Sequence, residues 1–248
     1  MSDIEMPILP EMADVWQQTL GWQPDSEQQK LFQQLYELIL AGNRQLNLTR
    51  ITSPEEFWEK HLWDSLRGIF SQKSEKIAGL SGKAIDIGTG AGFPGIPIAI
   101  AFPNYTVSLL DATRKKIAFL ENTTSELGLT NVNTITGRAE EIGQYPSDRN
   151  AYNLALIRAV AEPSVCAEYA LPLLKRGGLA ILYRGQWTTE ENDTLQPALE
   201  KLGGIVESIE EFTTPCSGSI RHCLYLRKVA PTPREFPRAV GVPAQKPL

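Results

Sequence analysis

The chain has few of the residues that build metal sites or disulfide frameworks: its 248 residues include two histidines and three cysteines. Cys166, Cys216 and Cys223 are odd in number and lack the paired spacing of a zinc site. Neither His61 nor His222 has the company of other ligands that a metal site needs. These absences predict a cytoplasmic protein without a metal.

Long apolar runs are also missing, and no signal peptide is expected. No segment approaches the length of a membrane-spanning helix, and the N-terminus, with Asp3 and Glu5, lacks the basic, apolar start of a signal peptide. Hydrophobic residues make up 42% and charged residues 21% of the chain, ordinary values for a soluble globular protein. The sequence therefore predicts no membrane partner.

An excess of positive charge is absent as well. The net charge of −5 and the pI of about 5.3 argue against nucleic-acid binding by bulk electrostatics. Residues 1–79 carry twelve acidic and seven basic residues, which alone gives −5. The rest of the chain is neutral overall, so any basic surface must be local.

What the chain does contain is a strand, a glycine turn and a helix start in one continuous run, AIDIGTGAGFPGIPIAIAF, residues 84–102. The strand is expected at Ala84–Ile87. Three glycines follow it and let the backbone turn tightly and approach a ligand: Gly88, Gly90 and Gly92. The run predicts a nucleotide-type cofactor pocket.

The spacing of the glycines narrows the choice of cofactor. A dinucleotide fingerprint has its third glycine where Phe93 stands. The pattern that begins at Asp86, D-x-G-x-G-x-G, instead resembles motif I of the class I S-adenosylmethionine-dependent methyltransferases. A glycine-rich turn without a cofactor is the alternative.

Two carboxylates follow the next predicted strands. Asp111 stands where an α/β cofactor fold places an acid at the tip of its second strand, and it can accept hydrogen bonds from both ribose hydroxyls. Bracing the helix that starts near Thr113 is a compatible role. In methyltransferases of this class a backbone N–H and a carboxylate after the third strand hold the adenine ring. Ala139 and Glu140 fall at that place.

The N-terminal part predicts helices. Apolar residues recur at helical spacing over Ser26–Ala41, with Ser26 as the expected N-cap and Gly42 just past the end. A second helix is expected to begin at Ser53 and run through Leu66.

From residue 84 onward, strand and helix patterns alternate, which predicts a parallel sheet with right-handed crossovers. Strands are expected at 84–87, 105–110, 132–136, 152–157 and 178–183, and helices at 94–101, 113–127, 163–174 and 189–202. Two longer strand patterns, 205–212 and 219–228, predict an antiparallel hairpin that closes one edge.

The predicted fold class is therefore α/β: a Rossmann-like, mostly parallel seven-stranded sheet with an antiparallel edge hairpin, plus N-terminal helices. The predicted organisation is a helical extension over residues 1–80, a methyltransferase domain over 81–228 and a tail over 229–248. Five prolines in the tail make a regular helix or strand improbable there, and a disordered tail is the simplest interpretation.

Several ordered blocks resemble the bacterial glucose-inhibited division protein B family, whose members are small-subunit (16S) ribosomal RNA guanine-N7 methyltransferases. The resemblance covers nearly the whole chain from about Ser26, and the tail FPRAVGVPAQKPL is similar to an extension that some members carry. The blocks are NLTRI (47–51), HLWDSL (61–66), DIGTGAGFPGIPIAI (86–100), GRAEE (137–141), IRAVA (157–161), YRGQ (183–186) and RHCLYLRK (221–228).

The resemblance implies S-adenosylmethionine as cofactor and small-subunit ribosomal RNA, or the ribosomal particle, as partner. The implied cofactor contacts are Gly88, Gly90, Phe93, Asp111, Ala112, Thr113, Ala139, Glu140 and Arg158. Members often have lysine where Arg184 stands, so a role that needs lysine geometry is in doubt there, whereas a phosphate contact survives the change.

The chemistry of the implied substrate fits the residues. Guanine N7 has a lone pair and no proton to lose, so its methylation needs orientation rather than a base or a covalent nucleophile. After the fourth strand the chain has Arg158-Ala159-Val160 in place of the Asn/Asp-Pro-Pro-aromatic tetrad of exocyclic-amine methyltransferases. Cys216, the one suggestive nucleophile for a carbon-5 methyltransferase, is expected to be a turn residue.

Arginines near the strand ends are the expected substrate contacts, because arginine suits phosphate and the guanine edge. Arg158 and Arg184 are candidates for positioning the substrate, and Arg138, Arg184 and Arg221 for binding RNA. Surface ion pairs with neighbouring glutamates are the alternative.

Two further alternatives concern the helices and the function. His61 and Asp64 could hydrogen-bond each other and brace the pocket, or simply pack. The rival functions are a methyltransferase acting on a small molecule or protein, and a cofactor-sensing RNA-binding module without catalysis.

Overall fold

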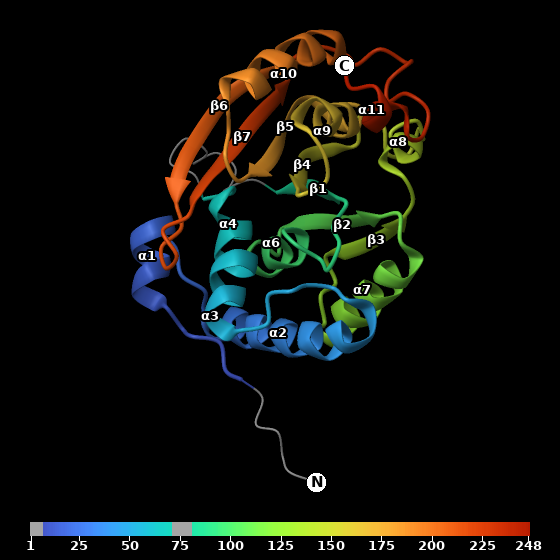
Figure 1. Cartoon of the computed structure of the whole chain (residues 1–248). Coiled ribbons are helices and arrows are strands. Elements are labelled where there is room, and N and C mark those ends of the chain that lie inside the picture. The colour runs from blue at the N-terminus through green and yellow to red at the C-terminus, as the bar shows by residue number, and fades with distance from the viewer. Residues whose placement is uncertain (1–6, 71–80) are drawn as a thin grey trace.

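Seven strands form one sheet in the computed structural model, which describes residues 7–70 and 81–248 (Figure 1). Their order across the sheet is β3-β2-β1-β4-β5-β7-β6. The first five are parallel, and β7 runs antiparallel to both β5 and β6. The bounds are β1 Gly82–Ile87, β2 Tyr105–Asp111, β3 Val132–Thr136, β4 Tyr152–Arg158, β5 Leu174–Arg184, β6 Gly204–Thr213 and β7 Ile220–Lys228.

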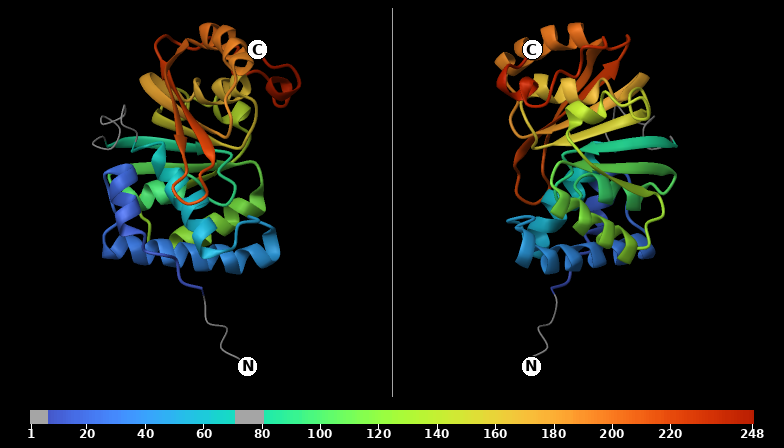
Figure 2. Two further views of the ribbon diagram at one scale, coloured as in Figure 1. Left: turned by 60° about the vertical axis from the view of Figure 1, so that its left-hand side comes forward. Right: turned by 90° about the vertical axis from the view of Figure 1, so that its right-hand side faces the viewer.

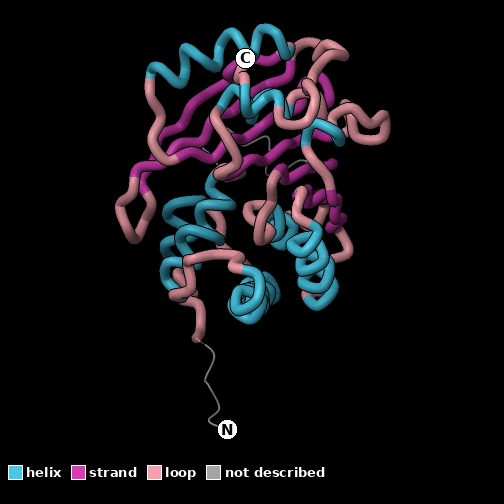
Figure 3. The backbone as a smooth tube through the Cα atoms, turned by 45° about the vertical axis from the view of Figure 1, so that its right-hand side comes forward, coloured by secondary structure: helices cyan, strands magenta, loops and turns pink. Residues whose placement is uncertain are grey.

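Helices cover both faces of the sheet, as the views in Figures 2 and 3 show. One face packs against the N-terminal helices, α6 and α7, and the other against α9 and α10. The bounds are α1 Ala13–Leu20, α2 Ser26–Leu46, α3 Pro54–Phe57, the π-helical turn η1 Trp58–Trp63, α4 Asp64–Arg67, α6 Gly95–Ala101, α7 Arg114–Glu126, α8 Ala139–Ile142, α9 Pro163–Ala170, α10 Thr189–Leu202 and α11 Val242–Gln245.

Alternate residues of the central strands enter two separate cores. Leu179 and Ile181 of β5 face the N-terminal helices, whereas Ala180 and Leu182 face α9 and α10. Because both faces are buried, the parallel strands read as nearly continuous apolar runs. The predicted fold class, with its antiparallel edge hairpin, is confirmed.

The N-cap residue of α2 and the position of its C-terminal end differ from the prediction. Asp25, rather than Ser26, is the N-cap: its carboxylate accepts hydrogen bonds from the N–H groups of Glu27 and Gln28, both at 2.9 Å. Gly42 lies inside the helix instead of ending it. A Cβ at Gly42 would lie 2.3 Å from the ring of Phe119 on α7, so this glycine allows two helices to pack closely.

Two elements of the second half also differ from the predicted ranges. α9 ends at Ala170 and not near residue 174, and β5 begins already at Leu174. The chain turns between them, and Leu173 O accepts hydrogen bonds from Ala151 N–H at 2.9 Å and Tyr152 N–H at 3.0 Å. Tertiary pairing therefore sets this boundary rather than the apolar pattern.

The tail follows a fixed path across the molecule, so the expectation of disorder is wrong. The guanidinium of Arg149 donates hydrogen bonds to three of its carbonyls, those of Phe236 at 2.7 Å, Thr232 at 2.9 Å and Pro233 at 3.0 Å. The short helix α11 follows and lies beside α8 and α9 (Figure 1). Prolines prevent long regular structure here, but a side-chain cation satisfies the free carbonyls.

Candidate functional site

The loop after β1 is held open by positive φ angles at Gly88 (70°) and Gly90 (61°). A Cβ on Gly88 would lie 2.7 Å from Val160 Cγ2, so no larger residue fits. Around Gly90 the closest atom to a Cβ would be Gly88 O at 3.9 Å. Gly90 therefore combines a glycine conformation with free space beside the backbone, which suits the close approach of a ligand.

Asp86, at the end of β1, braces this loop from inside. Its Oδ2 accepts hydrogen bonds from Thr89 Oγ1 at 2.6 Å and from Gly95 N–H at 2.8 Å, so it ties the strand to the start of α6. Burial raises the pKa of Asp86 to about 6, because the side chain is 1% exposed. Its position in the glycine motif was noted in the sequence, but its bracing role was not.

Asp111 lies at the tip of β2 and joins two loops. Its Oδ2 accepts a hydrogen bond from Gly90 N–H at 3.0 Å, and its Oδ1 accepts one from Thr113 N–H at 2.8 Å. Each carboxylate oxygen has further acceptor capacity. The predicted bracing role near Thr113 is present, and the ribose-binding role stays a prediction.

Glu140 on α8 is buried in a network of donors. Arg138 donates to it from Nη2 at 2.9 Å and from Nε at 3.3 Å, and Tyr169 O–H donates at 3.3 Å. The N–H of Gly241 in the tail donates at 3.0 Å. Burial opposes ionisation, but the hydrogen bonds from Arg138 and Gly241 outweigh it and lower the pKa of Glu140.

These groups surround a cavity of about 210 Å³, which we call the cofactor cavity. Of the predicted cofactor residues it brings together Gly88, Asp111, Ala112, Ala139 and Glu140. Gly90 and Thr113 border it through their hydrogen bonds to Asp111. Tyr169, Arg138 and Ala244 also line the cavity. No sequence motif marked Tyr169, and Ala244 lies in the tail that resembles a family extension, for which no cofactor contact was predicted.

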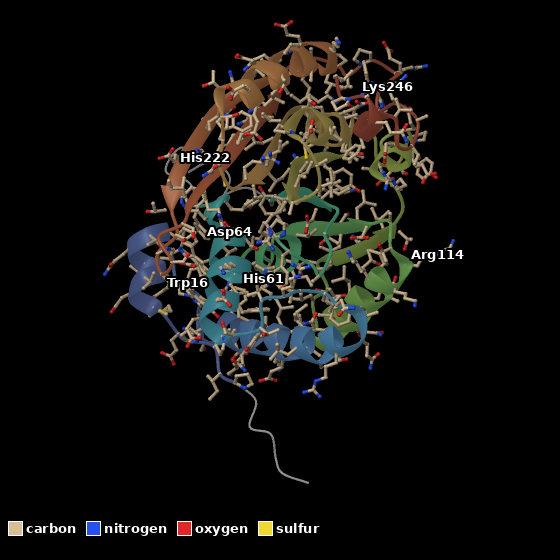
Figure 4. The ribbon with its side chains drawn as sticks, viewed as in Figure 1. Trp16, His61, Asp64, Arg114, His222 and Lys246 are labelled. Carbon is tan, nitrogen blue, oxygen red and sulfur yellow. The ribbon has the colours of Figure 1, made fainter. Side chains whose placement is uncertain are left out.

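A second cavity of about 390 Å³, the arginine cavity, lies at the same edge of the sheet. Arg158 forms its inner wall and donates to Lys60 O at 2.8 Å, to Asp64 Oδ2 at 3.2 Å and to His61 Nδ1 at 3.3 Å. His61 and Asp64 come from neighbouring turns of one helical segment (Figure 4). Among the hydrogen bonds of the described residues, His61 and Asp64 do not bond each other directly, as one alternative expected; each instead accepts a hydrogen bond from Arg158.

His61 is held as a neutral imidazole. Burial, followed by the charges of Arg158 and Lys60, lowers its pKa to about 3. Its ring stacks on Phe93 with centroids 4.3 Å apart and planes 9° apart, and the Arg158 guanidinium lies 5.7 Å from the Phe93 centroid. Arg158 lines the arginine cavity, whereas Phe93 lines neither cavity and contacts His61 and Arg158. Their cofactor contacts stay predictions.

Ala159 marks the border between the two cavities. Arg158 and Ala159 line the arginine cavity, whereas Val160 and Ala161 line the cofactor cavity. Ala159 has a φ of 55°, a conformation that costs an L-residue about 1–2 kcal/mol. The turn at residues 158–161 is therefore one thin wall shared by both cavities.

The four candidate arginines lie at the same sheet edge but differ in their partners. Arg184 and Arg221 line the arginine cavity; Arg184 pairs with Glu191, and Arg221 donates to Ile220 O at 3.3 Å. Arg138 pairs with Glu140 at the cofactor cavity, as the surface-pair alternative anticipated. Their RNA-binding roles stay predictions.

Cys216 lies exposed in the turn between β6 and β7. Partial desolvation of the sulfur, followed by the charge of Glu59, raises the pKa of its thiol, which disfavours the thiolate that a carbon-5 mechanism needs. Over residues 7–70 and 81–248, the structure contains no group of three or more potential metal ligands. No helix in these ranges is long and apolar enough to cross a membrane.

The chain is similar to known proteins over most of its length. A family model described as "rRNA small subunit methyltransferase G" matches residues 28–223. The chain is 67% identical to "Ribosomal RNA small subunit methyltransferase G" of Nostoc punctiforme over 97% of this chain and 99% of that protein. It is 65% identical to the protein of the same name from Trichormus variabilis, over 97% and 99% respectively.

A solved structure of Pyrococcus horikoshii TYW2 in complex with MeSAdo is similar in fold. The TM-score is 0.51 at 16% identity, and the match covers 67% of this chain and 62% of that chain. At this identity the likeness supports the fold alone.

Proposed function

Because the chain belongs to the rRNA small subunit methyltransferase G family, we propose that it transfers a methyl group from S-adenosylmethionine to N7 of a guanine in small-subunit (16S) ribosomal RNA. The observation that carries this proposal is the shared wall at residues 158–161. A methyl donor in the cofactor cavity and a base in the arginine cavity would lie on its two sides. Proximity of this kind supplies much of the rate of a transfer reaction.

The cofactor cavity fits the proposed cofactor. Bound S-adenosylmethionine supplies an electrophilic methyl group on a sulfonium. Asp111 has acceptor capacity for ribose hydroxyls, and Gly90 leaves space for a ligand beside the backbone. Ala139, at the first position of α8, has an N–H without an intrahelical acceptor, and Glu140 follows it. These two groups are proposed to hold the adenine ring.

The arginine cavity fits a guanine that loses no proton. His61 is neutral and already bonded on both ring nitrogens, to Arg158 and to Thr49 Oγ1 at 2.8 Å. No base is required, because the N7 lone pair attacks the methyl group directly. Arg158 and Arg184 are proposed to orient the nucleotide through O6 or phosphate, since a donor placed on N7 itself would block the reaction.

RNA is favoured over a small molecule or a protein by the charges at the rim. Residues 80–248 are neutral overall, yet arginines gather at one edge of the sheet. They can contact phosphates locally, which the net charge of the chain does not favour. A ribosomal partner also implies a cytoplasmic location. A module that only senses the cofactor would bind S-adenosylmethionine and RNA without turnover.

The test is methyl transfer from labelled S-adenosylmethionine to small-subunit ribosomal RNA, offered naked or as assembled subunits. Label is expected in RNA and is expected to disappear when guanosine is replaced by 7-deazaguanosine, in which a C–H replaces N7. Label in a metabolite or protein fraction instead of RNA would support the first rival, and binding without label would support the second. Label retained in the 7-deaza RNA would contradict the N7 assignment.

A further inference from the structure

The C-terminal segment reaches the cofactor cavity, where Gly241 meets Glu140 from 101 positions away in the sequence. Gly241 N–H donates to Glu140 Oε1 at 3.0 Å, and Ala244 of α11 lines the cavity beside Glu140 and Tyr169. In Figure 1 this segment, in red, lies next to α8 and α9. Both residues lie in the tail FPRAVGVPAQKPL, beyond residues 28–223, which the family model matches.

The donors around Glu140 fall unevenly on its two oxygens. Oε1 receives Arg138 Nη2, Tyr169 O–H and Gly241 N–H. Within the part of the chain that the structure describes, Oε2 receives a hydrogen bond from Arg138 Nε at 3.3 Å. Oε2 is thus the oxygen with capacity left for a ligand. Gly241 helps to fix which oxygen that is.

An ion pair holds the segment at its midpoint. Arg238 donates to both carboxylate oxygens of Glu168, with Nη2 at 2.6 Å from Oε2 and Nε at 3.0 Å from Oε1, and its backbone N–H adds a bond at 2.8 Å. Glu168 is fully buried on α9 and directly precedes Tyr169. A charge buried this deeply needs its partner in place, so the pair fixes the position of the segment on α9.

The start of the segment is held separately. Gln144 Nε2 donates to Pro237 O at 2.7 Å, and Thr232 Oγ1 donates to Leu202 O at 2.7 Å. Together with the bonds from Arg149, these contacts hold residues 232–237 without help from α11. Residues 238–245 can therefore be perturbed while the first half of the segment keeps its anchors.

We propose that residues 238–245 form part of the cofactor-binding site, positioning Glu140 through Gly241 and walling the adenine side of the cofactor cavity through Ala244. This inference rests on the proposed function, because it takes that cavity as the S-adenosylmethionine site. The segment acts as a positioning element: it sets the affinity for the adenosyl part of the ligand.

The test measures binding of S-adenosylmethionine and of S-adenosylhomocysteine by calorimetry. Deletion of residues 238–248 should raise both dissociation constants about tenfold or more, as expected when a hydrogen bond to a charged group is lost. Ala244→Phe, which leaves the anchors intact, should weaken both ligands in the same direction. Lys246→Ala, an exposed position on the same segment, is the matched control and should bind like the wild type.

Hydrogen exchange supplies a second readout that does not depend on any variant folding. In the wild type, S-adenosylhomocysteine should slow the exchange of amides 238–245 as well as those of the glycine loop. Protection of the glycine loop without residues 238–245, or unchanged affinity in Ala244→Phe, would overturn the inference alone. A wild-type protein that binds neither ligand would instead overturn the proposed function.

Discussion

Arg158 should be required both for the stability of the fold and for methyl transfer, and the two roles can be tested separately. Arg158→Leu removes the guanidinium that donates to Lys60 O, Asp64 and His61. Asp64 is 9% exposed, so in this variant its carboxylate would stay buried without the cation that pairs with it. Removing one partner of a buried pair costs about 3–5 kcal/mol.

The size of the loss should depend on pH in a defined direction. Burial raises the pKa of Asp64, and the charge and hydrogen bond of Arg158 oppose that rise. Without Arg158 the carboxyl takes up a proton more readily in the folded state than in the unfolded state. The destabilisation should therefore be smaller at pH 5 than at pH 8.

The test compares the thermal unfolding midpoints of the wild type and of three variants. Arg158→Leu should lower the midpoint by about 2–4 °C for each kcal/mol lost. The double variant Arg158→Leu/Asp64→Asn should recover much of that loss, because no charge is stranded, yet it should stay inactive on ribosomal RNA. Arg227→Leu, which breaks an exposed pair with Glu207, should cost less than about 1 kcal/mol.

Two results would refute this reasoning. An Arg158→Leu midpoint equal to that of Arg227→Leu would show that the buried pair does not stabilise the fold. Wild-type methyl transfer in the double variant would limit Arg158 to a structural role and remove it from substrate positioning.

Substitutions at four other positions test the remaining parts of the site. Asp111→Ala should weaken S-adenosylmethionine binding by about 1–3 kcal/mol, and unchanged affinity by calorimetry would remove Asp111 from the site. Arg221→Ala should reduce RNA methylation and lower the slope of the salt dependence of RNA binding by about one unit, while cofactor affinity stays within a few-fold of the wild type. A large loss of cofactor affinity would contradict an RNA-binding role for Arg221. Cys216→Ser should keep the single-turnover rate within a few-fold, whereas a folded but inactive variant would favour covalent carbon-5 chemistry. His61 has a pKa of about 3 in the folded chain and an ordinary value of 6.5, so between these pH values the unfolded chain binds more protons. The free energy of unfolding of the wild type should therefore fall with decreasing pH more steeply than that of His61→Gln, by up to about 1.4 kcal/mol per pH unit. Parallel stability profiles would contradict a buried neutral His61.

The sequence predicts those parts of the site that local spacing encodes. The glycine loop, Asp111 and Glu140 each follow a parallel strand, and parallel strands end at the same sheet edge, so their convergence follows from the strand pattern. The mostly parallel sheet could be anticipated from the same pattern, but the order of its strands was not predicted. Strand alternation and the final hairpin are visible in the sequence.

Contacts between distant segments could not be predicted in this way. Arg158 meets His61 and Asp64 from more than ninety positions away, and nothing in the spacing of His61 and Asp64 shows that a guanidinium joins them. Gly42 looked like a helix end because glycine usually disfavours helix interiors, but Phe119 on a distant helix requires it. Gly241 reaches Glu140 across a similar distance.

The central claim is tested most directly by mapping N7-methylguanosine at nucleotide resolution in small-subunit ribosomal RNA from cells with and without this protein. Chemical cleavage at N7-methylguanosine should reveal one position that is methylated when the protein is present and unmethylated when it is absent. Reintroducing the wild-type chain should restore the methyl group, whereas the Arg158→Leu/Asp64→Asn variant should not. An identical cleavage pattern with and without the protein would contradict the account.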